Sequence, residues 1–480
     1  MPHKDLREWM MHAQQLDELR RVNGVHWDME MSALSEMVAR NKKETRWALL
    51  CDEIVGYPKG YRVLLDPLAT LPRVAMTLDF DPGIERTEFS YKLREKINSL
   101  PSLAPEIVSD GPVLQNIREG KDIDMFSLPA PKYHTQDGGR YIGTGSVTVT
   151  RDPESGWVNL GTYRIMIHDE KTLSFHVSPS HHARIHRDQL FARGESMRVA
   201  VSFGHDPLLL LAGSASLPYG VSEYNWAGGV RGEPIEVIQA PHTGLPIPAT
   251  SEIVIEGISS PEDERPEGPF GEWHGYYASS SRLVSTIKVT SLMYRNDPII
   301  LGVPSLKPSV APLVFSSMLR EAVVLEQLEK AGVPDVKAIR FHDAAAETML
   351  SIIAIRQRYA GHSRQAARVL AQCGAGAYMG RYTIVVDDDI DIYDNDEVLW
   401  ALGTRSDPQN AIEILTHCLS GPLDPAIRPG PNKEKWFNSR AIIDACKPWD
   451  WRSEFPVAVE TPQELLREVK RKFGDQLHSP

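Results

Sequence analysis

Apolar residues at the start of the chain recur every three or four positions, which is the spacing of an amphipathic helix. These residues are Leu6, Trp9, Met10, Ala13 and Leu16. The apolar runs that follow are short and predict strands, whereas one longer run with mixed charges predicts a helix. The predicted strands are WALLCDEIVG, YRVLLD and PRVAMTLDF, and the predicted helix is FSYKLREKINSL. Residues 1–114 are therefore expected to form a small α/β domain.

Between residues 115 and 305 the pattern changes to many short strand-like runs separated by turn residues. The runs are YIGTGSVTVTRD, WVNLGTYRIMIHD, TLSFHVS, MRVAVSFG, SEIVIEGIS, RLVSTIKVTSLMYR and PIILGV. This arrangement is typical of an antiparallel sheet or barrel. Two short helices are predicted within it, at 182–192 and 206–215.

Helix–strand alternation returns in residues 306–455, which are expected to form a C-terminal α/β domain. The predicted helices are APLVFSSMLREAVVLEQLEKAG and NDEVLWALGTR, and the predicted strands are VKAIRFHD, TMLSIIAI and YTIVVDDDIDI. Residues 456–480 close the chain with a helix, where Thr461 as N-cap, Pro462 at the first position and Glu464 form a capping box. This helix is expected to pack either on a neighbouring subunit or on its own chain.

Composition narrows the function classes. The 480 residues carry a net charge of −12 without a dense Lys/Arg tract, which argues against a nucleic-acid groove or an anionic membrane surface. The four cysteines are far apart, the start of the chain does not have the pattern of a secretion signal, and the longest apolar run, PLLLLAG, is too short to span a membrane. We therefore expect a soluble, cytoplasmic protein.

The stretch EGPFGEWHGYY places two carboxylates, Glu267 and Glu272, on either side of a Pro-Phe-Gly turn, next to aromatic residues. Glycine and proline disfavour a helix here, so both acids are expected to project from a tight loop or bent strand. A partly aromatic environment raises the pKa of a glutamate and makes it a usable acid near neutral pH. Two solvated loop glutamates are the alternative.

Further polar residues occur within the strand-rich middle of the chain. Asn159 and Arg164 lie on one run, and a bulge or bend is needed for both to serve one cavity, because side chains alternate along a strand. A partly buried arginine such as Arg164 requires a carboxylate or phosphate partner. A solvent-exposed strand edge is the alternative position.

Asn159, His182 and Glu223 together offer one amide oxygen, one imidazole and one carboxylate. That set suits Mn²⁺ or Mg²⁺ with phosphate oxygens better than structural zinc. His182 and His186 would share a helix face, although surface histidines are the more common reading of such a cluster. The acidic run at 387–389 is interpreted as a solvated turn at a strand end rather than a metal site.

Taken in order, these motifs resemble the UbiD-type decarboxylases that use prenylated FMN. The resemblance is carried by Asn159-x4-Arg164, His182 before ARIHRDQ, Glu223 in YGVSE and Glu267-x4-Glu272. Further matches are DGGRYIGT, VVDDDIDIYDNDEVLWALGTR and IIDACKPW. Together they cover nearly the whole chain. The implied fold is α+β and multidomain, with a central antiparallel split β-barrel of the flavin-reductase type.

The resemblance also implies roles for individual residues. Asn159, His182 and Glu223 would bind a divalent metal, usually Mn²⁺, that ties the cofactor phosphate to the protein, and K⁺ often accompanies this site. Arg164, Glu267 and Glu272 would form the catalytic Glu-Arg-Glu network, with Glu272 as proton donor. Two departures from the family pattern concern cofactor contacts: His181 stands where a Gln is common, and Arg381 where a Lys is common.

The function implied is reversible non-oxidative decarboxylation of an aromatic, heteroaromatic or α,β-unsaturated carboxylic acid, with hydroxylated benzoic acids favoured. The expected partners are the acid substrate, CO₂, a flavin prenyltransferase that supplies the cofactor, and further copies of the chain in a homodimer or larger homo-oligomer. Two alternatives are a metal-assisted or glycoside hydrolase built on the paired glutamates and a non-catalytic flavin-binding module.

Overall fold

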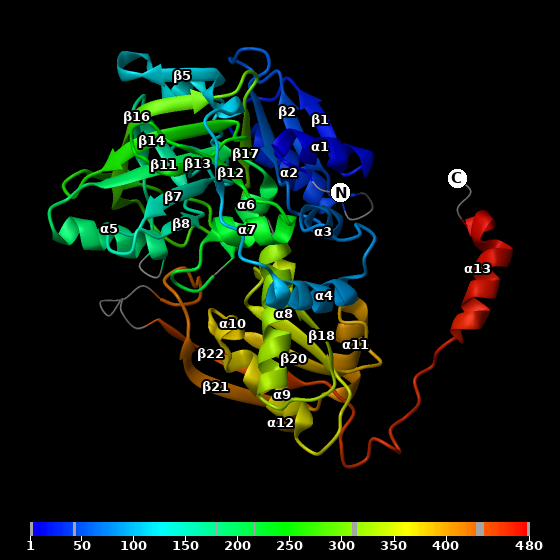
Figure 1. Cartoon of the computed structure of the whole chain (residues 1–480). Helices are drawn as coiled ribbons and strands as arrows, with labels where there is room; N and C mark the ends of the chain where they lie inside the picture. Colours follow the sequence, from blue (N-terminus) through cyan, green and yellow to red (C-terminus); the bar gives the residue numbers. More distant parts are fainter. Residues whose placement is uncertain are drawn as a thin grey trace.

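The structure, a computed structural model, contains three bodies and a helix that lies apart from them (Figure 1). Two bodies lie side by side, the third lies below them, and the long helix α8 (Val314–Lys330) runs down into the third. Within the described residues, no helix combines the length and apolarity that a membrane crossing requires. The structure describes residues 3–41, 45–178, 181–215, 217–309, 314–428 and 436–477.

The N-terminal body is built on a four-stranded sheet in the order β1-β2-β3-β17. Its last strand comes from much later in the chain and pairs in parallel with β3. The strands are β1 (Leu19–Asn23), β2 (Ala48–Asp52), β3 (Arg62–Leu65) and β17 (Ile299–Gly302), and the helices are α1 (Leu6–Gln15), α2 (Glu30–Arg40), α3 (Leu71–Thr77) and α4 (Arg86–Ser99). The predicted helices at the start of the chain and at FSYKLREKINSL are confirmed.

The prediction of a strand at PRVAMTLDF is wrong, because this run contains helix α3. Pro72 lies in the first turn, where its missing N–H costs no helical hydrogen bond. Five consecutive residues of α3 are buried, among them Arg73, which donates to Glu18 Oε2 at 2.6 Å. A run that is buried on all sides carries no periodicity, so its pattern does not separate a helix from a strand.

The middle body contains a ten-stranded antiparallel sheet, ordered β6-β9-β10-β16-β14-β11-β7-β8, with β5 and β15 also paired to β16. This sheet curls into an antiparallel half-barrel, which confirms the predicted split-barrel fold. Its strands are β5 (Asn116–Glu119), β6 (Arg140–Gly143), β7 (Val147–Arg151), β8 (Val158–Gly161), β9 (Ile165–Asp169), β10 (Thr172–Ser174), β11 (Met197–Gly204), β14 (Ile253–Ser259), β15 (Glu264–Glu267) and β16 (Arg282–Tyr294).

Three helices and a small sheet pack against β7, β8 and β11 of this half-barrel. The predicted helices at 182–192 and 206–215 are confirmed. The small sheet has the order β13-β12-β4. These elements are α5 (His182–Ala192), α6 (Pro207–Ser214), α7 (Glu223–Arg231), β4 (Glu106–Ile107), β12 (Glu236–Gln239) and β13 (Pro246–Pro248). Four short 3-10 turns lie at Pro112–Gln115, Gly120–Asp122, Met125–Ser127 and Asp343–Ala345.

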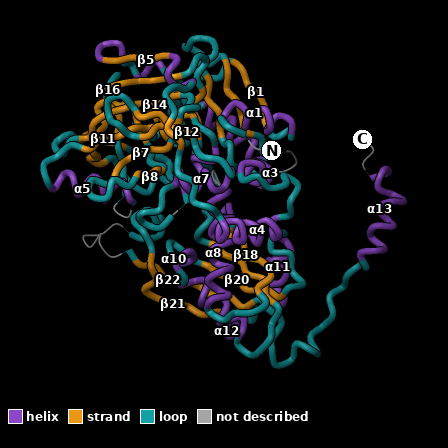
Figure 2. The backbone as a smooth tube through the Cα atoms, in the orientation of Figure 1, coloured by secondary structure: helices purple, strands orange, loops and turns teal. Residues whose placement is uncertain are grey.

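The C-terminal body is a five-stranded mixed sheet, ordered β18-β19-β20-β22-β21, between layers of helices (Figure 2). Helix α4 connects it to the N-terminal body through an ion pair of Arg86 with Glu321 at 2.8 Å. Its elements are β18 (Val336–Phe341), β19 (Leu350–Ile355), β20 (Tyr382–Asp387), β21 (Ile412–Leu419), β22 (Phe437–Asp444), α9 (His362–Gln372), α10 (Gly374–Ala377), α11 (Asn395–Arg405) and α12 (Pro408–Ala411).

The acidic run at 387–389, which begins with the last residue of β20, forms ion pairs with nearby cations. Asp389 accepts hydrogen bonds from Arg405 at 2.8 Å and from Lys447 at 2.7 Å. The predicted strand end is present, but the turn is tied to α11 and to the segment after β22. This run is structural.

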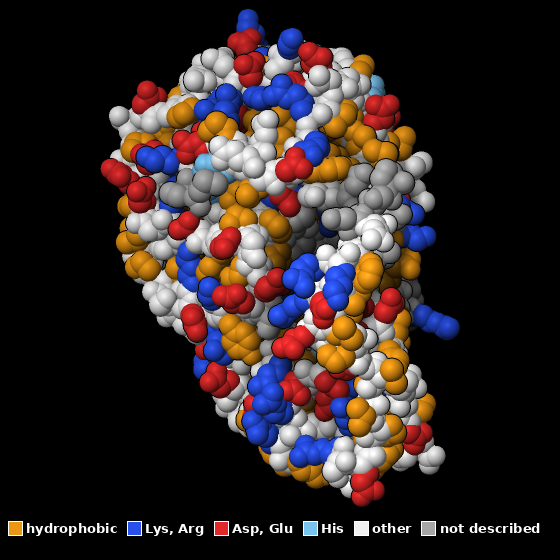
Figure 3. Space-filling model, turned by 90° about the vertical axis from the view of Figure 1, so that its right-hand side faces the viewer, with side chains coloured by type: hydrophobic (Ala, Val, Ile, Leu, Met, Phe, Trp, Pro, Cys, Tyr) orange, Lys and Arg blue, Asp and Glu red, His pale blue; other side chains and the backbone are white. Residues whose placement is uncertain are grey.

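Helix α13 (Gln463–Leu477) lies at the end of an extended segment, away from the three bodies (Figure 1). Its apolar side chains Leu465, Leu466, Val469 and Phe473 are 41 to 48% exposed. Figure 3 shows one face of the molecule, where Lys and Arg side chains are interspersed with Asp and Glu.

Candidate active site

One arginine binds both glutamates of the EGPFGE loop. Arg164 donates from Nε to Glu267 Oε1 at 2.8 Å and from Nη2 to Glu267 Oε2 at 2.9 Å. Its remaining terminal nitrogen, Nη1, donates to Glu272 Oε1 at 2.6 Å. The bidentate geometry on Glu267 is the stronger of the two pairings, because both carboxylate oxygens are engaged.

The required bend between Asn159 and Arg164 is present. Strand β8 ends at Gly161 and β9 begins at Ile165, so Arg164 lies in the irregular segment between them. Glu267 ends β15, and Glu272 follows in a loop without regular structure. The three charged groups thus converge from a strand break, a strand end and a loop.

All three charged groups are largely removed from water. Glu267 is fully buried and Glu272 is 5% exposed. Burial raises the pKa of Glu272, and the neighbouring Glu267 raises it further, although Arg164 opposes the shift. Burial lowers the pKa of Arg164, but Glu272 and Glu267 outweigh this and hold it above its usual range. The protonated form of Glu272 is therefore more favourable here than it would be in water, although a charged arginine lies beside it.

Two aromatic residues complete this network. The Tyr141 hydroxyl donates to Glu267 Oε1 at 2.9 Å, and its ring packs 4.4 Å from that of Phe270. The Arg164 guanidinium lies 5.0 Å from the centre of the Phe270 ring, within the range of a cation–π contact. The rings shield the charged groups from solvent.

The motif DGGRYIGT holds the glutamate loop in place. Asp137 Oδ1 accepts from the backbone N–H of Gly271 at 3.2 Å, and Gly138 N–H donates to Pro269 O at 2.9 Å. Any side chain at Gly138 would collide with the backbone at Gly268, since a Cβ there would lie 2.3 Å from its carbonyl oxygen. The glycine is required by this close approach.

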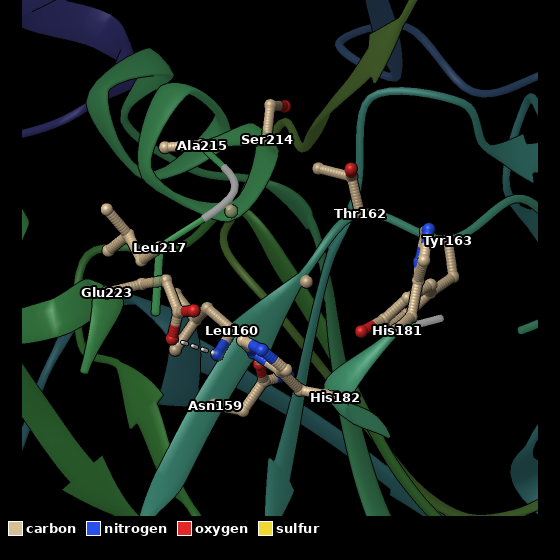
Figure 4. Close-up of a pocket in the computed structure, with 12 residues that line it drawn as sticks. Asn159, Leu160, Thr162, Tyr163, His181, His182, Ser214, Ala215, Leu217 and Glu223 are labelled. Atoms are coloured by element: carbon tan, nitrogen blue, oxygen red, sulfur yellow. Dashed lines mark hydrogen bonds between the residues drawn. The ribbon is translucent and has the colours of Figure 1, made fainter. Parts of the chain in front are cut away.

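A cavity of about 210 Å³ is lined in part by the segment that leads into Arg164 (Figure 4). Thr162 and Tyr163, the residues just before Arg164, form part of its wall. Its other lining residues come from β8, α5, α6 and α7 and from the loop between α6 and α7. They are Asn159, Leu160, Gly161, His181, His182, Gly213, Ser214, Ala215, Leu217 and Glu223.

The three residues predicted to bind a metal all line this cavity. His182 Nδ1 lies 3.2 Å from Asn159 Oδ1, close to the roughly 3 Å between adjacent ligands of an octahedral ion bound at about 2.1 Å. Glu223 lies beside them, where its Oε2 accepts from Leu160 N–H at 2.9 Å (Figure 4). Burial raises the pKa of Glu223 to about 7 and lowers that of His182. This donor set of oxygen and neutral imidazole suits a hard divalent ion.

Among the described residues, there is no cluster of three or more His, Cys, Asp or Glu side chains that could hold a metal. The predicted set contains two such side chains, His182 and Glu223, and its third member is Asn159. His186 does not join the set: it is fully buried, its Nδ1 lies 3.1 Å from Thr150 Oγ1, and it is absent from the cavity lining.

Two helix N-termini also face this cavity, since His182 begins α5 and Glu223 begins α7. In the described residues, neither helix is capped by the side chain of its N-cap residue. Uncapped N–H groups and the helix dipole favour an anion such as a phosphate.

The two remaining predicted cofactor contacts lie in different places. His181 lines the cavity, with its ring 5.5 Å from that of Tyr163. Arg381 lies just before β20 in the C-terminal body and donates to Asp424 Oδ1 at 2.5 Å. It is not part of the described cavity lining. Sequence reasoning did not include Asp424, which is 43 positions from Arg381.

Tyr141 is the residue of this network that sequence reasoning did not assign. The signal for it was its place in DGGRYIGT, one of the motifs that carry the resemblance. A tyrosine in a strand is common, so its type alone gave no reason to connect it with Glu267.

Comparison with known proteins agrees with this geometry. Three family models, described as the 3-octaprenyl-4-hydroxybenzoate carboxy-lyase N-terminal domain, Rift-related domain and C-terminal domain, match residues 11–89, 106–308 and 314–445. The chain belongs to the UbiD family. It is therefore a carboxy-lyase, and relatives that match nearly its whole length include proteins named as decarboxylases.

Three relatives illustrate this membership of the UbiD family. Pyrrole-2-carboxylic acid decarboxylase of Pseudomonas aeruginosa is 28% identical over 98% of both chains. The UbiD-class enzyme HmfF from Pelotomaculum thermopropionicum, in complex with FMN, superposes with a TM-score of 0.86 at 26% identity over 98% of this chain and 99% of that chain. Vanillic acid decarboxylase of Sedimentibacter hydroxybenzoicus, in open form, gives 0.86 at 26% identity over 100% of both chains.

Proposed function

We propose that this protein catalyses the reversible non-oxidative decarboxylation of an aromatic, heteroaromatic or α,β-unsaturated carboxylic acid with prenylated FMN. The observation that carries the proposal is one arginine shared by two buried glutamates, next to a cavity suited to a phosphate and a divalent ion. A glycoside hydrolase needs room for sugar and water between its two carboxyl groups. Here the Arg164 guanidinium is bound to both carboxyl groups, which argues against that alternative.

In this proposal, Arg164 and Glu267 form the fixed charged pair and Glu272 is the proton donor. When bound, prenylated FMN supplies the electron sink for the electron pair that remains as CO₂ leaves. Glu272 then gives its proton to the carbon from which CO₂ departed, so that one C–C bond breaks and one C–H bond forms. Proton uptake from water restores Glu272 for the next turnover. In the reverse direction, Glu272 removes the proton.

The phosphate of the cofactor would lie between the N-termini of α5 and α7. Asn159, His182 and Glu223 would hold Mn²⁺ or Mg²⁺ against it, with K⁺ nearby, and His181 would contact the cofactor from the same wall. Arg381 would need to release Asp424 before it could reach a phosphate. Support for a flavin comes from HmfF, which was solved in complex with FMN.

A hydroxylated benzoic acid is the substrate class that we favour. The vanillic acid decarboxylase similar to this chain acts on such a compound, and its likeness covers both chains completely. The segments NLGTYRI and SEYNWAGG, which contribute to the cavity, also resemble members of that type.

The test is to produce the protein together with a flavin prenyltransferase, the partner expected to supply its cofactor. We expect purified protein that absorbs in the near-UV and visible ranges and contains bound metal and phosphate. It should release CO₂ from at least one member of a panel of hydroxybenzoic, heteroaryl and alkenyl acids. Colourless, phosphate-free protein that releases no CO₂ under these conditions would contradict the proposal.

We also propose that α13 packs against a second copy of the chain. Its four exposed apolar side chains have no partner among the described residues of its own chain, and the extended segment before it gives it reach (Figure 1). Edge strand β21 exposes Ile414 and Leu419 and offers an apolar counterpart. Light scattering should show a homodimer or larger assembly for the full chain. Deletion of residues 461–480 should lower the mass, and an unchanged mass would contradict this docking.

A further inference from the structure

The two glutamates of the network receive unequal numbers of hydrogen bonds. Glu267 accepts three, from Arg164 Nε, Arg164 Nη2 and the Tyr141 hydroxyl. Among the described residues, Glu272 accepts one, from Arg164 Nη1 to its Oε1, and its Oε2 accepts none. Because a hydrogen bond to a carboxylate stabilises the ionised form, the excess of donors favours charge on Glu267. The same imbalance leaves Oε2 of Glu272 for the proton.

Tyr141 creates part of this imbalance, because it donates to one glutamate whereas Arg164 donates to both. Within the described part of the chain, the Tyr141 hydroxyl reaches only Glu267 and, at 3.5 Å, the carbonyl of Pro269. Tyr141 is fully buried on β6, and its strand pairs with β9, which begins one residue after Arg164. Its position is therefore set by the sheet and does not depend on a bound ligand.

We propose that Tyr141 is a positioning residue that assigns the single proton of the Glu-Arg-Glu network to Glu272, by donating its hydrogen bond to Glu267. The inference rests on the proposed function, in which Glu272 is the acid. Two carboxyl groups that share one cation titrate as a coupled pair, so a small bias decides which of them holds the proton. The tyrosine supplies that bias without touching substrate or cofactor.

The hydroxyl remains a donor over the working pH range. Burial raises the pKa of Tyr141 far above its ordinary value, and the adjacent Glu267 raises it further, although Arg164 opposes the shift. Other charged or titratable groups face the network from the surrounding elements, and both variants described below retain them. They are Asp137, His168, His176, Arg282 and Tyr378.

The test compares Tyr141→Phe with Tyr133→Phe as a matched control. Tyr133 is also buried, at 2% exposure, but its hydroxyl bonds to Thr144 Oγ1 at 2.9 Å instead of to a glutamate. Both substitutions remove one buried hydroxyl and keep the ring. When a carboxylate loses one hydrogen bond, the pKa of that carboxyl group rises by about one unit.

With the loaded enzyme, we expect the acid limb of the kcat/KM profile to move up by about one pH unit in Tyr141→Phe, because a second proton enters the pair more easily. The basic limb should move up by less than the acid limb, since it reports loss of the proton that the two glutamates then share. At neutral pH, kcat should fall by about twofold to fivefold with KM nearly unchanged, because the proton is then shared with Glu267. The profile of Tyr133→Phe should match the wild type. An acid limb in Tyr141→Phe that coincides with that control would overturn the proposal.

A second measurement needs neither activity nor the tyrosine variant. Infrared difference spectra of the cofactor-free full-length protein at neutral pH should show a protonated carboxyl band that Glu272→Gln removes. If Glu267→Gln removes that band and Glu272→Gln leaves it, the proton lies on the wrong residue and the proposal is overturned. The outcomes remain separable from those of the proposed function. An active Glu272→Gln enzyme refutes the acid itself, whereas an inactive one with unshifted Tyr141→Phe profiles refutes only the role of the tyrosine.

Discussion

The charged network and the adjacent cavity are both built from polar residues, yet they differ in what completes them. Arg164, Glu267, Glu272 and Tyr141 satisfy one another through four hydrogen bonds. The cavity instead presents an amide, an imidazole, a carboxylate and two helix N-termini that converge on open space. The charges of the network are paired within the protein, whereas the polar groups of the cavity would be paired by the phosphate and metal that we propose. Variants of the network should therefore alter stability and chemistry, and variants of the cavity should alter loading first.

The largest effect is expected for Arg164→Met, which leaves two buried carboxyl groups without their cation. Removal of one partner from a buried ion pair costs about 3–5 kcal/mol of unfolding free energy. Decarboxylation should be lost as well. Urea unfolding followed by circular dichroism measures the first effect. Arg265→Met is the control, since Arg265 forms a half-exposed pair with Asp169, worth about 0–1 kcal/mol. Equal losses in the two variants would contradict the proposed buried network.

Glu272→Gln should retain cofactor and fold but lose turnover by about two to four orders of magnitude, the usual contribution of a general acid. The check is CO₂ release per bound cofactor, with cofactor counted from the absorption spectrum. Glu264→Gln, an exposed position on the same stretch of chain, should behave as wild type. Turnover that survives in Glu272→Gln would show that another group donates the proton.

Glu223→Gln should have the opposite effect to Glu272→Gln, because it should lose cofactor while each loaded molecule keeps its turnover. Metal and cofactor content should fall by at least about tenfold, because loss of support for a bound metal costs at least that much affinity. Activity should fall only in proportion to the lost cofactor. Metal analysis and absorption spectra of the purified protein measure both, with exposed Glu236→Gln as control. A fully loaded variant would remove Glu223 from the cavity's ligand set.

The smallest effect concerns the pH dependence of stability in the cofactor-free protein. Burial raises the pKa of Glu272 above its ordinary value of 4.5, so the folded state holds this proton more tightly than the unfolded state. The contribution of Glu272 to stability is thus complete below pH 4.5 and lost as pH rises through its folded pKa. Its slope is at most about 1.4 kcal/mol per pH unit. The free energy of unfolding, taken from unfolding curves across this pH range, should depend less on pH in Glu272→Gln than in the wild type. Glu264→Gln should show the same pH dependence as the wild type.

Much of the secondary structure follows from local pattern, and the exceptions have a common cause. The helices α1, α5 and α11 were predicted because their residues show helical spacing or lie between turn residues. Helix α3 was missed because it is buried on all sides, and the pairing of β17 with β3 joins residues more than 200 positions apart. Local sequence does not encode what covers a segment or which distant strand it pairs with.

The same division applies to the site. The sequence by itself determined which residue types are present, their order, and the family to which they belong. Only the tertiary structure decided that Arg164 contacts glutamates 103 and 108 positions away, that it engages Glu267 with two bonds and Glu272 with one, and that Tyr141 adds a third donor to Glu267. It likewise placed Arg381 on Asp424 and not on the cavity. Residue identity fixes which charges are available, but the proton's position depends on distances set by the folding of remote strands against one another.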